Sequence, residues 1–336
     1  MKIIAVNVKD GGGRELLLYL ARYIKSRNLK DTFSFYVDTR FITGINCSQN
    51  ISVIQSNNLL KKIFCFVFPS DNSLFFGNLP PVRKVNKSAV YFHNAYLLMS
   101  VTDLFREKVR FDELIKIIFL QFYIFFFISN VGKVFVQSSL IEKKFVKKYK
   151  FSNTEVMPFY EEPKNLANNK SKKYDFCYIS LSRPHKKHNM LLIAFEKLLA
   201  KGYAISCALT VESADKKLLD KIFYLNKKYK AKIENFGVVP RKKVKSIYQN
   251  SKCLVFPSSK ETFGLPLIEA ASLGLDIIAP DLAYVHEVIE PSLVFEPNSA
   301  DSLFKKLKHY YKHGADKPKC KTENKVSKLL SYFKEL

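Results

Sequence analysis

The sequence predicts an α/β protein with two domains, each built around an open parallel sheet. Three observations support this prediction. At 336 residues the chain exceeds the usual size of one hydrophobic core, so two domains of roughly 150 residues each are expected. Short apolar runs alternate with helical patterns through both halves, which is typical of parallel sheets. A polar stretch between the halves indicates a linker.

The boundaries follow from this change in composition. We expect a first domain over residues 1–160 and a linker over 161–173, which is nearly free of apolar residues. A second domain should cover 174–318. Residues 319–336 end in an amphipathic pattern and predict a terminal helix.

The charge of the chain is strongly basic and evenly distributed. Lys and Arg outnumber Asp and Glu by 23 to 11 in residues 1–160 and by 32 to 19 in residues 161–336, for a net charge of +25. Such a surface favours anionic partners, either nucleic acid or the acidic inner leaflet of a membrane. Neither zinc-finger spacing nor a recognition-helix signature occurs, so the membrane is the preferred interpretation and no nucleic-acid partner is expected.

The cysteines and the start of the chain indicate a cytoplasmic protein. The six cysteines stand singly, without the spacing of a metal site, and read as reduced core thiols. Residues 1–6 are apolar only briefly and predict a first strand rather than a signal peptide. No run reaches the roughly 18 apolar residues of a membrane span.

The first domain opens with a strand, a glycine run and a helical pattern. Gly11, Gly12 and Gly13 could form a tight turn or bring backbone amides close to a ligand. They do not match the dinucleotide fingerprint, because Leu16 stands where the third glycine belongs. Strands are expected at residues 2–8, 33–37, 51–54, 63–68 and 88–92.

Two polar residues, His93 and Asn94, directly follow the expected strand at 88–92. In an open α/β sheet, residues just beyond the carboxyl end of a strand face the ligand crevice. A single histidine is also common as a structural group. The residues alone leave both interpretations open.

The most apolar stretch covers residues 114–128. It contains a lysine and a glutamine and is too short to span a bilayer, so a core helix is expected. The alternative is a helix that dips into the membrane interface beside Arg106, Lys108, Arg110 and Lys116. A last strand at 133–137 and a helix that opens with a capping box at Ser139 complete the domain.

The second domain repeats the alternation of strands and helices. Its basic loop at 182–191 contains Arg183, Lys186 and Lys187 and follows the first expected strand. This is the phosphate-facing position of a nucleotide-binding half, although a solvated basic loop is the simpler alternative. Strands are expected at residues 175–180, 205–211, 232–236, 253–256, 277–280 and 293–295, and helices at 191–200, 214–229 and from about 300.

The stretch 258–274 combines a loop, a helix start and a helix stop. Pro266 suits the first helical position and Gly274 the left-handed residue after the last turn. The amides and the dipole at such a helix start form an anion site, which Gly264 leaves open.

Two carboxylates, Glu261 and Glu269, flank this anion site. Aimed at a diphosphate they would repel it, so they are expected to accept hydrogen bonds from hydroxyls on either side of it. A ligand with hydroxyls flanking a diphosphate is a nucleotide sugar. The alternative is that a glutamate near a helix start complements only the dipole.

Glu261 and Glu269, with seven residues between them that include Phe263-Gly264-Leu265-Pro266, resemble a known family signature. It is the E-x7-E motif of retaining glycosyltransferases of the GT-B fold, family 4 (group 1). The stretches around Lys186 and around Gly237 are also similar to that family. The resemblance implies two Rossmann-like domains that face each other across a cleft, with a C-terminal helix that crosses back to the first domain.

The resemblance also implies the roles of single residues. It makes Glu261, His93 and Lys186 catalytic, with Lys186 as the charge on the diphosphate. No metal or other cofactor is implied, because no two aspartates lie two residues apart to hold a divalent ion. The residues expected to bind substrate are Arg183, Lys187, Glu269, Phe263, Gly264, Leu265, Pro266, Gly237, Val238, Gly12, Gly13 and Asn94.

The expected function is therefore retaining transfer of a hexose from a nucleotide diphosphate sugar to a hydroxyl of a glycan. UDP is the expected carrier by family habit and GDP is the alternative. The basic surface suggests a lipid-linked cell-envelope glycan as acceptor and a peripheral position on the inner face of the plasma membrane. The alternatives are a sugar-nucleotide epimerase of the same fold and a basic nucleic-acid-binding protein. A dehydrogenase is disfavoured by the broken glycine fingerprint.

Overall fold

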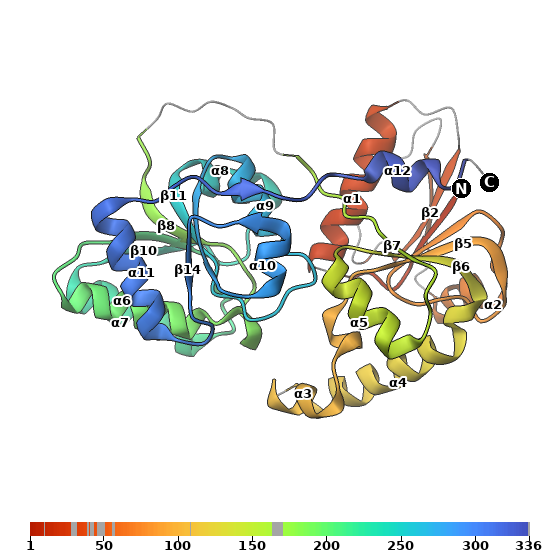
Figure 1. Cartoon of the computed structure of the whole chain (residues 1–336), viewed down its shortest axis with the longest axis horizontal. Coiled ribbons are helices and arrows are strands. Elements are labelled where there is room, and N and C mark those ends of the chain that lie inside the picture. Colours follow the sequence, from red (N-terminus) through yellow and green to blue (C-terminus); the bar gives the residue numbers. More distant parts are fainter. Residues whose placement is uncertain are drawn as a thin grey trace. The chain divides into compact units, whose positions relative to one another are not determined.

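A computed structural model of the chain describes residues 1–9, 11–27, 32–38, 40, 44–45, 51–55, 58–107, 109–162 and 171–334. The chain forms two compact units (Figure 1). Unit 1 comprises Met1–Glu161 and Glu323–Leu336, and unit 2 comprises Glu162–Thr322. Of the expected linker, residues 163–170 lie outside the described residues, as does Lys108.

Unit 1 is built on a seven-stranded parallel sheet with the order β3-β2-β1-β4-β5-β6-β7. The expected strands at 33–37, 51–54 and 88–92 are present, and the first strand is shorter than expected. The strands are β1 (Lys2–Ala5), β2 (Phe33–Val37), β3 (Ile51–Gln55), β4 (Ser73–Phe76), β5 (Val85–Phe92), β6 (Val131–Val136) and β7 (Thr154–Val156).

The strand expected at residues 63–68 is wrong, because this run lies in helix α2 (Leu59–Val67). The Asn58 side chain caps the helix by accepting a hydrogen bond from the Leu60 amide at 2.8 Å. A short apolar run does not by itself distinguish a strand from a helix. The strand next to β1 is instead the fully buried β4, which the sequence analysis did not identify.

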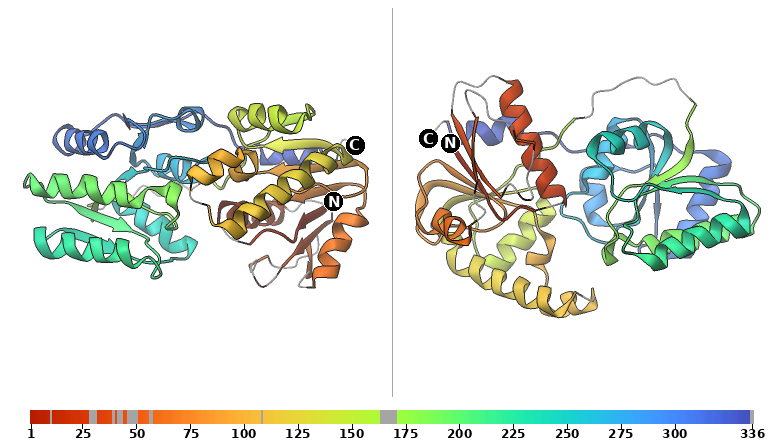
Figure 2. Two further views of the ribbon diagram at one scale, coloured as in Figure 1. Left: turned by 90° about the horizontal axis from the view of Figure 1, so that it is seen from below. Right: turned by 180° about the vertical axis from the view of Figure 1, so that it is seen from behind.

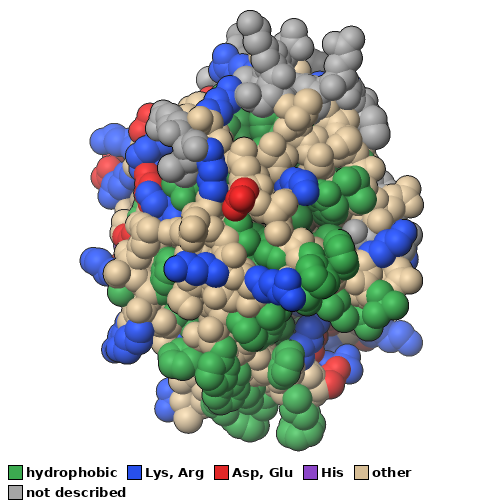
Figure 3. Space-filling model, turned by 90° about the vertical axis from the view of Figure 1, so that its right-hand side faces the viewer, with side chains coloured by type: hydrophobic (Ala, Val, Ile, Leu, Met, Phe, Trp, Pro, Cys, Tyr) green, Lys and Arg blue, Asp and Glu red, His purple; other side chains and the backbone are tan. Residues whose placement is uncertain are grey.

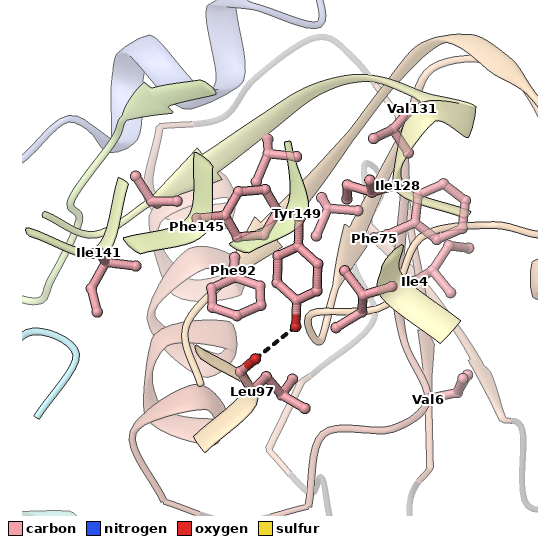
Figure 4. Packing of buried hydrophobic residues seen from close by; sticks show 14 residues of the cluster. Ile4, Val6, Phe75, Phe92, Leu97, Ile128, Val131, Ile141, Phe145 and Tyr149 are labelled. Atoms are coloured by element: carbon pink, nitrogen blue, oxygen red, sulfur yellow. Dashed lines mark hydrogen bonds between the residues drawn. The ribbon is translucent and has the colours of Figure 1, made fainter. Parts of the chain in front are cut away.

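Three helices of unit 1, α2, α4 and α5, cover the same face of the sheet, and α1 and α12 cover the other (Figure 1). One core cluster joins residues of β1, β4, β5 and β6 to Cys65 and Phe66 of α2, Ile117 and Ile124 of α4, and Phe145 of α5. Figure 4 shows Phe145 of α5 packed beside Phe92 of β5 in this cluster. The helices are α1 (Gly11–Ser26), α2, α3 (Val101–Arg106), α4 (Phe111–Phe127), α5 (Ser139–Tyr149) and α12 (Val326–Ser331), with short 3-10 turns η1 (Ala95–Leu98) and η2 (Ile128–Asn130).

Two helix expectations in unit 1 change in detail. The cap of α5 is Ser138 rather than Ser139, since the Ser138 hydroxyl accepts from the Ile141 amide at 3.3 Å. Helix α4 covers the expected apolar stretch, but only Leu114 and Ile124 are buried, so it is not a helix enclosed by core. Among the described residues, no helix is both long enough and apolar enough to cross a membrane.

Unit 2 is built on a six-stranded parallel sheet with the order β10-β9-β8-β11-β12-β14. All six expected strands are present, some with shifted ends. They are β8 (Tyr174–Tyr178), β9 (Ser206–Leu209), β10 (Lys232–Asn235), β11 (Ser251–Val255), β12 (Asp276–Pro280) and β14 (Leu293–Phe295), and β13 (Ile289–Glu290) pairs separately with β15 (Lys319–Cys320).

The helices of unit 2 lie on both faces of its sheet, with α6, α7 and α11 on one face and α8, α9 and α10 on the other (Figure 1). Helix α8 begins directly after Pro240 and was not predicted from the sequence. The helices are α6 (His188–Ala200), α7 (Lys216–Tyr229), α8 (Arg241–Gln249), α9 (Leu265–Ser272), α10 (Ala283–Val288) and α11 (Ala300–His313), with the 3-10 turn η3 (Pro184–Lys186).

Candidate functional site

In unit 2 the strand order reverses between β8 and β11. The chain proceeds from β8 to β9 and β10 on one side, and from β11 to β12 and β14 on the other. In open α/β sheets, ligands bind at such a switch point, beyond the carboxyl ends of the strands. The loop after β8 carries Lys186 and the loop after β11 carries Glu261, so both expected catalytic residues of this unit lie at this position.

The structure joins these two residues by an ion pair. Lys186 Nζ lies 2.5 Å from Glu261 Oε1, and each side chain is about one-sixth exposed, at 17% and 16%. The Lys186 ammonium also lies 5.8 Å from the centre of the Phe256 ring. The sequence places Lys186 and Glu261 75 residues apart, and the adjacency of β8 and β11 brings them together.

Two buried tyrosines hold the loops that carry this pair. The Tyr178 hydroxyl donates to the Lys186 carbonyl at 2.8 Å, and the Tyr284 hydroxyl donates to the Ser258 carbonyl at 2.6 Å. Burial raises the pKa of both tyrosines well above its usual value, and the Glu261 charge raises it further. Both hydroxyls therefore remain neutral donors at physiological pH.

The two loops also bond directly to each other. The Ser259 amide donates to the His185 carbonyl at 2.8 Å, and the Ser259 hydroxyl donates to the same oxygen at 3.2 Å. These bonds and the tyrosine bonds fix both loops at the backbone. The Lys186–Glu261 pair therefore lies on a preorganised frame.

Helix α9 starts from a left-handed glycine. Gly264 has φ +79° and is the N-cap, Leu265 is the first helical residue and Pro266 the second, one position later than expected. A Cβ at Gly264 would lie 3.0 Å from Leu267 Cδ1, so a side chain would be both strained and crowded. The N-terminal amides of α9 thus begin directly beyond the Glu261 loop.

Glu269 lies inside α9 and is paired with a residue that the sequence analysis did not select. Its Oε1 lies 2.6 Å from an Arg241 guanidinium nitrogen at the start of α8. Glu269 is buried, and Arg241 is partly exposed. The Glu269 carboxylate, which the sequence predicts to bind substrate, is therefore held by an ion pair with Arg241.

The other expected donor-site residues of unit 2 occupy different environments. Arg183 is exposed at the start of η3, and Lys187 takes a left-handed conformation between η3 and α6. The Phe263 side chain is buried at 2% exposure. Gly237 and the exposed Val238 follow β10, the edge strand, which lies two strands from β8.

Unit 1 has its own switch point, between β1 and β4. Gly13, in the first turn of α1 after β1, approaches the His93 ring so closely that a Cβ there would lie 2.5 Å from His93 Nε2. The His93 amide donates to Asn78 Oδ1 at 2.7 Å, which ties it to the loop after β4. The structure thus gathers the glycine run and His93, which the sequence separates by 80 residues.

The environment of His93 keeps its imidazole neutral. Desolvation lowers the pKa of His93 to about 4, and a hydrogen bond with the Tyr91 backbone opposes this only in part. The ring stacks on Phe76 with centroids 5.3 Å apart. Two other residues expected to bind substrate in unit 1 are Asn94 and Gly12. The Asn94 side chain caps η1 by accepting a hydrogen bond from the Tyr96 amide at 3.0 Å, and Gly12 is exposed.

Sequence reasoning missed Tyr178, Tyr284, Arg241 and Asn78. The available signal was position, because Tyr178 ends an apolar strand and Asn78 follows another, which are the ligand-facing places of an open sheet. Arg241 and Tyr284 do not lie directly at the end of an apolar strand, so this signal does not select them. Their contacts depend on how α8 and α10 pack beside α9.

Curated relatives match parts of the chain. It is 33% identical over 72 residues to the O-antigen chain mannosyltransferase B of Escherichia coli, a match that covers 21% of this chain and 19% of that protein. It is 23% identical over 190 residues to the O-antigen chain mannosyltransferase RfbU of Salmonella typhimurium, covering 53% of this chain and 50% of that protein. The chain therefore aligns with half or less of the length of each relative.

Solved structures match nearly the whole chain. WaaG, a glycosyltransferase involved in lipopolysaccharide biosynthesis, superposes with a TM-score of 0.65 at 14% identity, covering 93% of this chain and 90% of WaaG. Anabaena Alr3699/HepE in complex with UDP and glucose superposes with a TM-score of 0.60 at 13% identity, covering 93% and 90%. These matches confirm the expected α/β fold with two Rossmann-like sheets.

The sequence profile described as "Glycosyl transferases group 1" matches residues 160–327, which is half of the chain. This range includes β8, β11, the Lys186–Glu261 pair and Glu269. The chain therefore belongs to the group 1 family of glycosyl transferases.

Proposed function

We propose that the protein is a retaining, metal-independent hexosyltransferase of glycosyltransferase family 4. It takes the sugar from a nucleotide diphosphate sugar and transfers it to a hydroxyl of a glycan. The observation that carries this proposal is the Lys186–Glu261 pair at the β8–β11 switch point of unit 2. An ammonium and a carboxylate side by side match the two halves of such a donor, an anionic diphosphate and a sugar rich in hydroxyls.

Donor binding would rearrange this pair. The diphosphate carries more negative charge than Glu261, so it competes for the Lys186 ammonium. Glu261 then gains the freedom to accept hydrogen bonds from sugar hydroxyls. Charge that develops on the departing diphosphate is stabilised by Lys186 and by the amides at the start of α9, where Gly264 presents no side chain.

Glu269 is assigned to the ribose hydroxyls of the nucleotide. Its Oε1 accepts from Arg241, which holds the carboxylate in place, and its remaining acceptor positions suit a vicinal diol. The exposed Arg183 and the partly exposed Lys187 add positive charge beside Lys186. Gly237 and Val238 are assigned to the nucleotide base.

We assign His93, Gly12, Gly13 and Asn94 to the sugar and acceptor side of the reaction. Because the pKa of His93 is lowered to about 4, its neutral imidazole can exchange hydrogen bonds with hydroxyls without adding a charge. In a retaining transfer, the acceptor hydroxyl attacks on the face from which the diphosphate departs. Groups that orient hydroxyls there contribute mainly by positioning.

The donor and acceptor classes draw support from the relatives. HepE is complexed with UDP and glucose, which supports a UDP-sugar donor, and a GDP-sugar is the alternative. RfbU and mannosyltransferase B are O-antigen chain mannosyltransferases, which supports a lipid-linked cell-envelope glycan as acceptor. Such an acceptor would place the enzyme on the cytoplasmic face of the plasma membrane.

The test combines binding and chemistry. Thermal shift against UDP-sugars and GDP-sugars identifies the donor, since a ligand at 100 times its dissociation constant adds about 2.7 kcal/mol of stability. Lys186→Ala and Glu261→Gln should lose turnover by at least about 100-fold, while the matched exposed variant Lys242→Ala should not. Near wild-type turnover in both site variants would contradict the assignment.

Metal independence and stereochemistry need separate measurements. Turnover should persist in EDTA, and activity that vanishes and returns only with a divalent ion would contradict the proposal. The product should keep the anomeric configuration of the donor, as measured by NMR. An inverted product would rule out the retaining assignment but leave the donor site intact.

A further inference from the structure

Helix α4 presents a continuous apolar stripe to solvent. Phe111, Ile115, Phe119, Phe122 and Phe126 are exposed and follow one another at intervals of four, four, three and four residues. These intervals place all five side chains on one face of a helix. The stripe runs along the whole of α4, opposite the buried Leu114 and Ile124.

Helix α2 presents a second exposed apolar face. Leu60, Phe64 and Phe68 lie at intervals of four, and Leu59 and Ile63 lie beside them, all exposed. The Arg83 guanidinium lies 4.7 Å from the centre of the Phe68 ring, so a cation borders this face. Of these residues, Ile63, Phe64 and Phe68 lie in the run 63–68 that was expected to form a strand.

The two helices belong to one layer of unit 1. Both contribute to the same core cluster, and both hold the Pro80–Val82 segment between them. The Val82 amide donates to the Phe66 carbonyl of α2 at 2.8 Å, and the Tyr123 hydroxyl of α4 donates to the Pro80 carbonyl at 2.9 Å. Figure 2 shows α4 in the same helical layer as α2 and α5 from two further directions.

Helix α5 lies in the same layer and is positively charged. It carries Lys143, Lys144, Lys147 and Lys148 against a single acidic residue, Glu142. Lys148 Nζ donates to the Met99 carbonyl at 2.7 Å, and Gln121 Nε2 of α4 donates to the same oxygen at 3.0 Å, so α4 and α5 are neighbours. Figure 3 shows hydrophobic side chains gathered on one face of the molecule with Lys and Arg around them.

We propose that the exposed faces of α2 and α4, flanked by the lysines of α5, form a docking surface for an anionic lipid bilayer. The phenylalanines and leucines enter the interfacial zone with both helices lying in the plane of the membrane, and the lysines contact anionic headgroups. Phenylalanine-rich faces bordered by lysine are the pattern of helices that lie on a membrane. This surface differs from the donor site, and it includes α2 and α5 in addition to the apolar stretch of α4.

Charge favours a bilayer over other occupants of this surface. A second copy of the chain would bring its own lysines against these lysines, since the net charge is +25. A bilayer of anionic lipids supplies both an apolar interior and negative charge over a wide area. Exposed apolar surfaces of this kind mark places of association.

The experiment measures sedimentation of the full chain with vesicles, and its readout does not depend on transferase activity. Vesicles of phosphatidylcholine with phosphatidylglycerol should bind the wild type more tightly than vesicles of phosphatidylcholine alone. Phe119→Ser with Phe122→Ser should weaken binding to both by at least about tenfold, because two rings leave the interface. Lys143→Gln, Lys144→Gln and Lys147→Gln together should abolish the preference for anionic vesicles.

Matched variants in unit 2 serve as controls. Phe223 on α7 is 68% exposed, against 67% for Phe119, and Phe223→Ser should bind vesicles as the wild type does. Lys216→Gln with Lys217→Gln should keep the anionic preference. Because the changed side chains are exposed, the unfolding midpoints should remain unchanged, and this is checked for every variant.

Three outcomes would overturn the proposal. The first is absence of wild-type binding to anionic vesicles at low salt. The second is equal loss of binding in Phe223→Ser and in the α4 double variant. The third is a wild-type dimer that the α4 double variant converts to monomer, because the face is then covered by a second copy.

Discussion

At the scale of single residues, the candidate donor site depends on groups that hold other groups. Tyr178 and Tyr284 each donate a hydrogen bond to the backbone of one loop, and these loops carry Lys186 and Glu261. Neither tyrosine hydroxyl needs to touch substrate for this role. The tyrosines therefore position the loops without taking part in the chemistry. This role can be tested by removing one tyrosine hydroxyl.

Tyr284→Phe should destabilise the protein by about 1–3 kcal/mol, because the buried Ser258 carbonyl loses its partner. The loop that carries Glu261 should then become less ordered, so donor KM should rise and kcat should fall. Urea unfolding and steady-state kinetics measure both effects. Tyr311→Phe, at a partly exposed tyrosine of α11, is the matched control, and equal effects in both variants would contradict the assigned role.

His188 should make the protein sensitive to acid. Burial, and secondarily the Lys186 charge, lower the pKa of His188 to about 4 from an ordinary 6.5. Between these values the unfolded state binds a proton that the native state does not, so stability falls as the pH drops from about 6.5 towards 4. The loss between pH 7 and pH 5 should be about 2 kcal/mol for this residue.

This prediction is checked by urea unfolding at both pH values. In His188→Leu the difference in free energy of unfolding between pH 7 and pH 5 should shrink by about 2 kcal/mol. His313→Leu removes an exposed histidine of α11 and should leave the difference unchanged. An unaltered pH dependence in His188→Leu would show that His188 is not the responsible group.

At the scale of elements, local sequence signals located most helix ends but not every helix. Helix α11 begins at Ala300, close to the expected position, with Ser299 as its cap, and Gly274 follows α9 with φ +75°. The run at 63–68 was assigned to a strand, because its apolar residues fit a buried strand as well as a helix. The sheet provides the distinction, since β4 occupies the place beside β1.

Gly264→Ala tests the start of α9. The left-handed backbone should cost about 1–2 kcal/mol for a residue with a Cβ, and the crowding against Leu267 should add to this and disturb the anion site. Gly202→Ala is the control, since Gly202 has φ +82° but open space around its Cβ position. Both variants should lose stability, but only Gly264→Ala should weaken nucleotide-sugar binding, as measured by calorimetry.

At the scale of the whole molecule, the chain returns to unit 1 after completing unit 2. Residues 323–336 belong to unit 1 by their contacts. Asn324 Nδ2 donates to the Tyr160 carbonyl at 2.7 Å, and the Tyr332 ring lies edge-on to Phe135 with centroids 5.1 Å apart. The last helix therefore contributes to the stability of the unit formed by the start of the chain.

Leu329→Ala should destabilise unit 1 by about 2–5 kcal/mol, because Leu329 is fully buried and its truncation leaves a cavity. Hydrogen exchange should speed up in β6 and β7 and remain unchanged in β8 and β11. Leu60→Ala, at an exposed leucine of α2, should have little effect. Faster exchange in β8 instead would contradict the assignment of this helix to unit 1.

The sequence by itself determined the α/β class, the division into two sheets and most strands, since these depend on apolar runs and turn residues that are local in the chain. It also selected Lys186, Glu261, Glu269 and His93, because motif spacing and the ends of strands are local signals. The pairing of Lys186 with Glu261 depends on β8 and β11 being neighbours in the sheet.

The remaining contacts needed the tertiary structure. Arg241 meets Glu269 only because α8 and α9 pack side by side, and the exposed phenylalanines of α4 are distinguished from core residues only by what the sheet covers. The physical reason is that hydrophobicity and spacing are encoded residue by residue. Contacts between segments far apart in the chain decide which charged side chains pair with each other. The same contacts decide which apolar faces remain exposed to water.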